Sequence, residues 1–411
     1  MKIIKPVVKF PFPGPKTKKI VSEINKFAVP STYAYPLAIK DGQGVYLKDA
    51  DNNWFLDFNS NVCATPLGYR HPEILEVIAD FSRNGAHKIA GQDFYTKEHA
   101  KLLSALLSIT PSSFRKVFLS NTGAEAVENA IKFAYRRNGP KYGIACEKAF
   151  HGRTLGALTY TNSKAVHKKN YPSLTHLVIP FCREDDDEEI NLIDDVVSET
   201  GKPAFVIVEG IQGEGGYRPA SKKFIRKLAS VANKNDFALI FDEVQSGMGR
   251  TGKWWSFEHF GVTPDIISVA KSLQVGATIS NSKYATKEIG AVSSTWGGGS
   301  RIDMAIALKI IEIIKRENLV KQAKLKGRII SDLLFSMQKR HSIVTDSRGI
   351  GLMQAIEFTT SKIRDQVIQK ALKKGLALLP CGEKTIRIAP PLIISEKEIY
   401  LGLQILEESL R

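Results

Sequence analysis

Short apolar runs alternate with helical periodicity between about residues 70 and 290. Each run is about the length of a strand, and together they cover residues 116–120, 142–146, 205–209, 237–241 and 266–270. The segments between them place apolar residues three and four positions apart, as one buried helix face requires; the clearest example is Val127, Ala130, Ile131 and Ala134. This alternation predicts an α/β fold with a mostly parallel central sheet and helices on both of its faces.

The segments on either side of this region have a different pattern. The first 30 residues are rich in Pro and Lys and predict an arm, and residues 35–58 predict a small antiparallel meander. After Gly299 the pattern predicts long helices over about 302–340 and a closing helix from residue 395. Between these helices, short strands are expected near residues 353–358, 376–380 and 385–389.

The length of 411 residues and these changes of pattern indicate more than one domain. We expect a large domain over residues 70–299. The N-terminal arm and meander over residues 1–69 and the C-terminal residues 300–411 are expected to form a smaller α+β domain.

Composition narrows the class of protein. Apolar residues make up 43% and charged residues 24% of the chain, which is typical of a globular protein and excludes disorder or a fibre for most of its length. No apolar run approaches the roughly 18 residues that span a bilayer. Pro6, Pro11 and Pro13 interrupt any signal-peptide core. We therefore expect a soluble, cytoplasmic protein that has no membrane partner.

The charge balance raises the question of an anionic partner. The chain has 58 basic and 42 acidic residues, a net charge of +16, which suits nucleic acid or a small anion. The basic residues are scattered without a block of five, however, and this argues against nucleic acid. The four cysteines form no CxxC pair, so we expect free thiols and no metal site.

The segment from Val117 to Ala126 combines the end of a strand, a turn that contains Gly123 and the start of a helix. A helix N-terminus presents unpaired N–H groups and the positive end of its dipole, and it therefore binds anions such as phosphate. An ordinary strand-to-helix turn has the same pattern, so this segment alone leaves both interpretations open.

Three ionisable residues follow neighbouring apolar runs. Asp242 and Glu243 come directly after one run, and Lys271 ends the next, 29 residues after Asp242. The carboxyl edge of an open α/β sheet is where ligands bind. Adjacent residues of an extended chain point to opposite faces, so one carboxylate can face a ligand while the other faces the protein.

A strand-end charge pair and a solvated lysine are the plainer interpretations of these residues taken singly. Taken with the phosphate turn, they form the set that pyridoxal 5'-phosphate (PLP) needs. The turn anchors the phosphate, Lys271 bonds to the cofactor, and Asp242 keeps the pyridine nitrogen protonated.

The order of motifs along the chain resembles the class III aminotransferases of PLP fold type I. This group contains ornithine, acetylornithine, 4-aminobutyrate and lysine 6-aminotransferases. The resemblance extends from about residue 33 to residue 411, and its most specific stretches are residues 121–128, 149–154, 208–216, 240–252 and 265–271.

The resemblance implies a role for each matching cofactor residue. Lys271 matches the lysine that forms the Schiff base and moves the proton, and Asp242 matches the partner of the pyridine nitrogen. Gln245 matches the group near the ring hydroxyl, and Phe150 matches the aromatic residue that stacks on the ring. The other implied cofactor contacts are Gly123 and Ala124 at the phosphate, His151, and Thr295, which matches a threonine that reaches the phosphate of the neighbouring subunit. The resemblance thus implies a homodimer with shared active sites.

The resemblance also implies how substrates are held. Arg153 resembles the arginine that binds the distal carboxylate of an ω-amino acid, and Arg387 resembles the arginine that binds the α-carboxylate of glutamate or 2-oxoglutarate. Glu214 resembles the gate that pairs with that second arginine. Val62 lies at the position of a substrate-wall residue, where an aliphatic side chain resembles the 4-aminobutyrate and lysine types. Without the motifs, each arginine would be interpreted as part of a surface ion pair.

The resemblance therefore predicts transfer of the terminal amino group of an ω-amino acid to 2-oxoglutarate by a ping-pong mechanism. Donors like 4-aminobutyrate or lysine rank before ornithine and acetylornithine. Three departures from the family pattern leave the donor open: residues 272–277 after the lysine, Gly210 in place of Pro, and Gly299 in place of Asn. The alternatives are an aminomutase or racemase on the same scaffold, and a non-enzymatic protein that binds PLP or nucleic acid.

Overall fold

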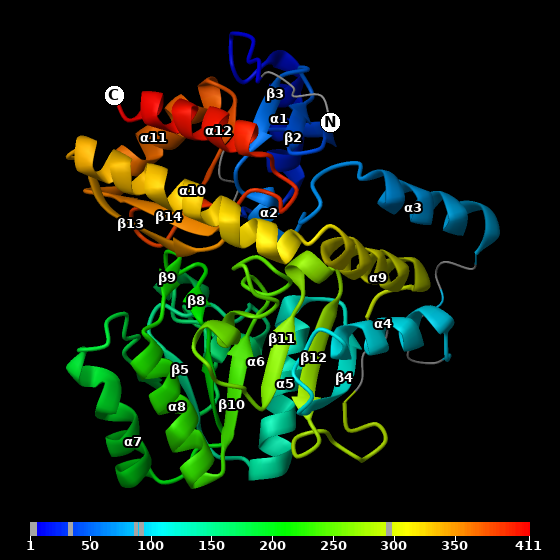
Figure 1. Cartoon of the computed structure of the whole chain (residues 1–411), viewed down its shortest axis with the longest axis vertical. Coiled ribbons are helices and arrows are strands. Elements are labelled where there is room, and N and C mark those ends of the chain that lie inside the picture. The colour runs from blue at the N-terminus through cyan, green and yellow to red at the C-terminus, as the bar shows by residue number, and fades with distance from the viewer. Residues whose placement is uncertain (1–5, 32–35, 86–88, 90–93, 293–297) are drawn as a thin grey trace. The chain divides into compact units, whose positions relative to one another are not determined.

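The computed structural model describes residues 6–31, 36–85, 89, 94–292 and 298–411. The chain divides into two compact units, a larger one of Glu73–Ala323 and a smaller one that combines Met1–Pro72 with Lys324–Arg411 (Figure 1). The larger unit extends beyond residue 299 because helix α9 (Arg301–Arg316) belongs to it. Arg301 Nε lies 2.9 Å from Glu98 Oε2 on helix α4 (Lys97–Leu107), which ties α9 to this unit.

A seven-stranded sheet forms the centre of the larger unit, in the order β4-β12-β11-β10-β7-β5-β6. Its strands are β4 (Phe114–Ser120), β5 (Gly143–Cys146), β6 (His176–Ile179), β7 (Phe205–Val208), β10 (Ala238–Asp242), β11 (Ile266–Val269) and β12 (Gly276–Asn281). Neighbouring strands run parallel, except that β12 is antiparallel to both β11 and β4. The prediction of a mostly parallel sheet is confirmed, and all five predicted runs are strands.

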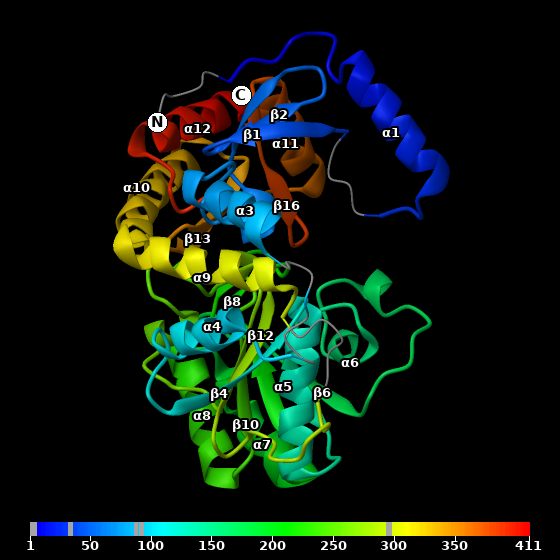
Figure 2. The same cartoon turned by 90° about the vertical axis from the view of Figure 1, so that its right-hand side faces the viewer.

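Helices cover both faces of this sheet (Figure 2). Helix α5 (Gly123–Asn138) lies on one face, and its predicted apolar residues pack against Phe205, Ile207, Ala238 and Ile240. Helix α8 (Lys222–Asn235) lies on the other face and buries Phe224, Ile225 and Leu228. The remaining elements of this unit are α3 (Pro72–Asn84), α6 (Leu155–Thr159), α7 (Leu192–Thr200), and the ribbon of β8 (Ile211–Gln212) and β9 (Arg218–Pro219).

Two strands of the sheet, β6 and β12, were not among the predicted runs. Strand β6 lies at the sheet edge, and its residue Val178 is 44% exposed, so it lacks a continuous buried run. Apart from Ile279, strand β12 consists of small and polar residues because α5 lies close to it. Thr278 Oγ1 donates to the Ala126 carbonyl at 2.7 Å, and a side chain at Gly276 would lie 2.4 Å from Ser120 Oγ.

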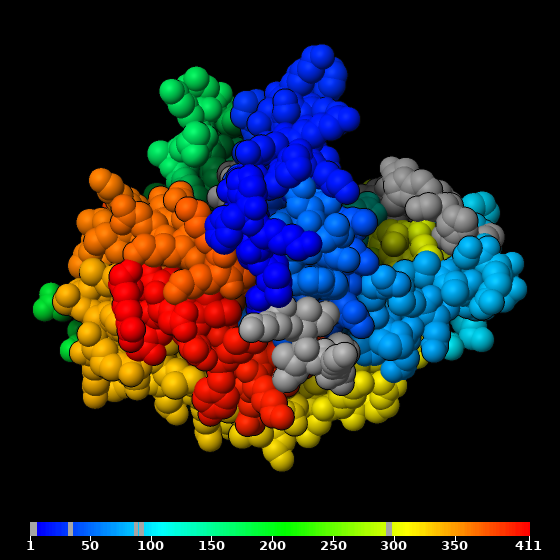
Figure 3. Space-filling model, turned by 90° about the horizontal axis from the view of Figure 1, so that it is seen from above, coloured from blue at the N-terminus to red at the C-terminus, as the bar shows by residue number. Residues whose placement is uncertain are grey.

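The smaller unit contains two four-stranded sheets. The first, in the order β1-β2-β3-β15, is the predicted antiparallel meander with one parallel strand added: β1 (Ile39–Gln43), β2 (Tyr46–Asp49), β3 (Trp54–Asp57) and β15 (Leu376–Ala377). The N-terminal and C-terminal parts of the chain therefore meet in this unit, as their blue and red surfaces show in Figure 3. The second sheet is antiparallel and consists of β13 (Val344–Ile350), β14 (Met353–Phe358), β17 (Thr385–Ile388) and β16 (Leu379–Cys381).

The described residues of the smaller unit and its boundary also form five helices: α1 (Pro15–Phe27), α2 (Ser60–Cys63), α10 (Leu319–Arg340), α11 (Ser361–Lys373) and α12 (Glu396–Ser409). The sequence pattern did not predict α1, α11 or β13. No helix in the described part of the chain is both long and apolar enough to cross a membrane. All four cysteines are free and buried.

Candidate active site

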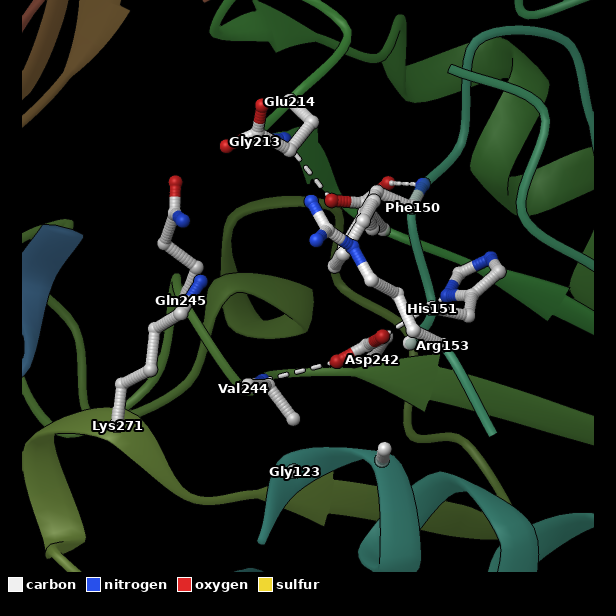
Figure 4. Close-up of a pocket in the computed structure, with 13 residues that line it drawn as sticks. Gly123, Phe150, His151, Arg153, Gly213, Glu214, Asp242, Val244, Gln245 and Lys271 are labelled. Atoms are coloured by element: carbon white, nitrogen blue, oxygen red, sulfur yellow. Dashed lines mark hydrogen bonds and ion pairs between the residues drawn. The ribbon is translucent and has the colours of Figure 1, made fainter. Parts of the chain in front are cut away.

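A cavity of about 250 Å³ lies at the carboxyl edge of the parallel strands, entirely within the larger unit (Figure 4). Residues that follow β4, β7, β10 and β11 reach it, because the carboxyl ends of parallel strands meet at one edge. The lining includes nine of the residues predicted from the sequence: Gly123, Ala124, Phe150, His151, Arg153, Glu214, Asp242, Gln245 and Lys271.

Asp242 is fixed at the end of β10 by three donors. Its Oδ2 lies 2.8 Å from His151 Nδ1, and its Oδ1 accepts hydrogen bonds from the Val244 amide at 3.0 Å and from Ser268 Oγ at 3.3 Å. Both Asp242 and His151 are buried. The carboxylate is therefore held in one orientation, and Figure 4 shows it in the floor of the cavity.

The neighbouring carboxylate, Glu243, faces the protein interior on the opposite side of the strand. It accepts hydrogen bonds from Ser246 Oγ at 2.6 Å, Ser256 Oγ at 2.7 Å and the Phe257 amide at 3.0 Å. Burial raises the pKa of Glu243 to about 7, against these hydrogen bonds, which lower it. The structure thus confirms that one carboxylate of the pair faces the cavity and the other the protein.

The predicted phosphate turn is the N-terminus of α5. Thr122 caps the helix: its Oγ1 accepts the Glu125 amide at 3.2 Å, and Glu125 Oε2 accepts the Thr122 amide at 3.1 Å. The first amides of a helix have no partner within it, so those of Gly123 and Ala124 remain for a ligand in the cavity that both residues line. A side chain at Gly123 would lie 2.7 Å from Val244 Cγ1, so a glycine allows the close approach.

Lys271 lies two residues after β11, at the start of a short 3₁₀ turn (Lys271–Leu273). Its side chain and that of Gln245 both project into the cavity (Figure 4). Gln245 is only 7% exposed, and its Oε1 has no hydrogen-bond partner among the described residues. The buried Nε2 atom of His151 also has no hydrogen-bond partner among the described residues. Buried polar atoms are costly unless they are paired, so the site is suited to a polar ligand.

The aromatic and cationic residues at the cavity form one cluster. The Arg153 guanidinium lies over the Phe150 ring, with Cζ 5.7 Å from the centroid, and His167 meets the same ring edge-on at 5.8 Å. Burial lowers the pKa of His167, and the charge of Arg153 lowers it further. His167 is therefore a neutral neighbour of Phe150 and Arg153 at neutral pH.

Val62 and Arg387 belong to the smaller unit, where the turn that contains Val62 is hydrogen-bonded to the segment that follows Arg387. Four successive residues, Ser60 to Cys63, have positive φ angles, and that of Val62 is 55°. The turn is held because Asn59 Oδ1 accepts the Val62 amide at 2.8 Å and Ser60 Oγ donates to the Ala389 carbonyl at 2.6 Å. Ala389 lies two residues after Arg387, which is 3% exposed and donates from Nη2 to the Pro380 carbonyl at 3.0 Å.

Thr295 lies outside the described residues. Glu209 lines the cavity but was not predicted from the sequence, and neither was His167, which contacts Phe150. A signal for Glu209 was present, because a carboxylate directly after a buried strand, β7, repeats the pattern of Asp242 after β10. His167 ends a short 3₁₀ helix (Ala165–His167), and no pattern in the sequence distinguishes it.

A family model described as aminotransferase class-III matches residues 28–410. The chain belongs to the class III aminotransferases. An acetylornithine aminotransferase from Caldanaerobacter subterraneus is 33% identical to this class III enzyme, over 94% of the chain and 97% of the relative. Human mitochondrial 4-aminobutyrate aminotransferase is 30% identical, over 98% of the chain and 91% of the relative.

Solved structures show the same fold. The lysine aminotransferase from M. tuberculosis superposes with a TM-score of 0.89 at 26% sequence identity, covering 96% of this chain and 98% of that one. This class III aminotransferase therefore has the PLP fold type I that the sequence predicted. The confirmed activity is that of an aminotransferase.

Class III aminotransferases depend on PLP, and the cavity of this one fits the cofactor. The first amides of α5, which have no partner within the helix, suit a phosphate. The fixed carboxylate of Asp242 suits a protonated ring nitrogen, and the buried atoms of Gln245 and His151 that lack partners among the described residues suit further polar contacts.

Proposed function

We propose that this aminotransferase moves the terminal amino group of an ω-amino acid to 2-oxoglutarate by a ping-pong mechanism. One observation carries the proposal: the Arg153 guanidinium lies over Phe150 in the cavity that also contains Lys271 and Asp242. A cation in this place fixes a carboxylate at a distance from the reacting amine, as an ω-amino acid requires. The acetylornithine and 4-aminobutyrate aminotransferases among the relatives support the same class of donor.

When bound, PLP supplies an electron sink for the bonds at the reacting carbon of the amino acid. The residues of this chain supply the rest. Asp242, oriented by His151, stabilises positive charge at the ring nitrogen. The Lys271 amine would take the proton from the reacting carbon of the amino acid and return it to the cofactor carbon on the other side of the amino nitrogen, so that the amino group is transferred without a separate base.

The second half of the cycle needs a site for a dicarboxylate. We assign the α-carboxylate of glutamate or 2-oxoglutarate to Arg387 and the gating of that arginine to Glu214. The buried position of Arg387 on β17 supports this, because a guanidinium with few competing waters binds a carboxylate strongly. We assign the substrate wall to Val62.

Two further assignments belong to the same proposal. The enzyme works as a homodimer, in which Thr295 reaches the cofactor phosphate of the neighbouring subunit. It acts in the cytoplasm on small amino acids and 2-oxo acids, and neither nucleic acid nor a membrane is its partner. Sedimentation and salt-dependent DNA-binding measurements test these two statements directly.

The donor is tested by half-reactions of the holoenzyme with single amino acids, followed by the visible absorbance of the cofactor. The proposal predicts conversion by at least one of 4-aminobutyrate, lysine, ornithine and N-acetylornithine, and reversal by 2-oxoglutarate. Conversion only by amino acids that lack a terminal amino group, such as alanine and glutamate, contradicts an ω-amino donor. Turnover of one amino compound without any 2-oxo acid indicates an aminomutase or racemase instead.

A further inference from the structure

The buried carboxylate of Glu209 lines the cavity and connects two separate segments of the chain. It follows strand β7 and is 7% exposed. Its Oε2 accepts the Phe150 amide at 3.0 Å, and its Oε1 accepts the Gly213 amide at 2.8 Å. The dashed lines at Phe150 and Gly213 in Figure 4 mark these two hydrogen bonds.

Each of these amides belongs to a segment that carries a proposed substrate residue. Phe150 begins the segment that leads to Arg153, and Gly213 directly precedes Glu214. We infer that Glu209 is a positioning residue that holds the Arg153 and Glu214 segments in register and thereby sets the affinity of the site for its amino donor. The part of this inference that concerns affinity for the amino donor rests on the proposed function.

The packing around Glu209 fixes where its side chain lies. A side chain at the next residue, Gly210, would lie 2.7 Å from Ser256 Oγ and 2.9 Å from Phe260 Cε2. Gly213 is restricted as well, because a side chain there would lie 2.6 Å from Gln245 Oε1. These two glycines, which both follow Glu209, therefore let the chain turn tightly after the carboxylate, which gives a physical reason for Gly210.

The charges around Glu209 make its ionisation sensitive to pH near neutrality. Burial raises its pKa to about 7, the negative charge of Asp242 adds to the increase, and His151 and the two amides oppose it. Cys146 also faces it, and the cavity contains Arg153, Glu214 and Lys271. The carboxylate accepts two N–H groups equally well, whereas a carboxylic acid has a hydroxyl in place of one acceptor. The connection is therefore complete above pH 7 and weaker below it.

Glu243 provides a matched control. It is fully buried, and the pKa of its carboxyl is also raised to about 7. Its partners, Ser246, Ser256 and Phe257, do not line the cavity. A substitution of Glu243 therefore removes a buried carboxyl of the same kind whose side-chain hydrogen bonds, within the described part of the chain, do not reach the Arg153 or Glu214 segment.

Hydrogen exchange of the holoenzyme tests the structural part, with rates corrected for intrinsic chemistry. At pH 8, E209Q should raise exchange in peptides that contain the Phe150 or Gly213 amide by about tenfold or more, since one of two charge-assisted hydrogen bonds is lost. E243Q should leave these peptides unchanged. Wild-type protein at pH 6 should exchange faster there than at pH 8, and E209Q should not show this difference. Equal protection of both peptides in E209Q and wild type would overturn the inference.

Steady-state kinetics test the functional part. E209Q should raise the KM for the ω-amino donor by about tenfold and change kcat less, because it displaces binding residues and leaves Lys271 and Asp242 in place. A fall in kcat at unchanged KM contradicts a positioning role for donor binding. If the wild-type enzyme accepts no ω-amino donor, the proposed function fails, while the exchange measurement still decides whether Glu209 holds the two segments.

Discussion

The Nδ1 atom of His151 lies 2.8 Å from the Oδ2 atom of Asp242, and both side chains are almost completely buried. The two residues are 91 positions apart in the chain and come from different elements, so the contact is made only by the folded larger unit. The imidazole orients a carboxylate whose other oxygen is held by Val244 and Ser268. A carboxylate fixed in this way stabilises a cation without having to reorganise.

Replacement of Asp242 tests this relationship. D242N keeps the shape of the side chain and removes its charge, and we expect the rate of amino transfer to fall about a hundredfold or more. H151A should lower the rate of amino transfer less than D242N does, because Val244 and Ser268 still hold the carboxylate. The double variant should be little worse than D242N, since His151 acts through Asp242. Single-turnover rates of the three variants decide the point, and strictly additive losses would show that His151 acts independently.

The proposed carboxylate site predicts a difference between donors. R153A should raise the KM for ω-amino acids more than the KM for glutamate, because glutamate has a second carboxylate for Arg387. R137A is a suitable control: Arg137 pairs with Asp236 at 3.2 Å on the surface and does not line the cavity. Equal increases in KM for both donors would show that Arg153 does not bind the distal carboxylate.

The positive φ angle of Val62 predicts an unusual effect on stability. A left-handed backbone costs a residue with a Cβ atom about 1–2 kcal/mol, and a β-branched side chain suits it poorly. V62G should therefore be about 1 kcal/mol more stable than V62A, although both variants lose the isopropyl group. Thermal or denaturant unfolding of the two proteins measures this. If V62A is the more stable, the turn adopts a different backbone in solution.

Much of the fold follows from the apolar runs of the sequence. Strands β5, β7, β10 and β11 are mainly buried apolar stretches because helices cover both faces of the sheet, and β4 is apolar only in its second half. Strand β12 could not be found in this way. Its small residues, such as Gly276, are selected by the closeness of α5 and the phosphate turn rather than by burial of a large side chain.

Residues of the site were predictable where an ionisable side chain follows the end of a strand. Asp242 and Lys271 were found from such positions, and Glu209 has the same signal. The two hydrogen bonds of Glu209 could not be predicted, because they depend on where the 149–154 and 210–216 segments lie in space. The placement of His167 against Phe150 depends on tertiary structure in the same way.

The buried carboxyl of Glu243 predicts a pH dependence of stability. Its pKa is raised from 4.5 to about 7, so the folded state binds the proton more tightly than the unfolded state between these values. The stability that this group contributes is therefore present below pH 4.5 and is lost as the pH rises to 7, by about 3 kcal/mol.

E243Q removes this titration while keeping the shape of the side chain. Its unfolding free energy should fall less steeply than that of the wild type between pH 4.5 and 7, and the two curves should be parallel above pH 7.5. Unfolding in denaturant across this range measures the difference. Glu209 titrates in both proteins, so it does not contribute to the comparison. Parallel curves over the whole range would mean that Glu243 is not a buried group with a raised pKa.

The most direct test of the account is single-turnover amino transfer by the wild-type holoenzyme, K271A and K168A. Lys168 is a matched control, because it is half-buried in the larger unit and its Nζ donates to the Thr159 carbonyl at 2.6 Å and to Asn162 Oδ1 at 2.7 Å, outside the cavity. We predict that K271A fails to transfer the amino group and loses the visible absorbance of the bound cofactor, while K168A behaves like the wild type. Transfer at the wild-type rate by K271A would contradict the account.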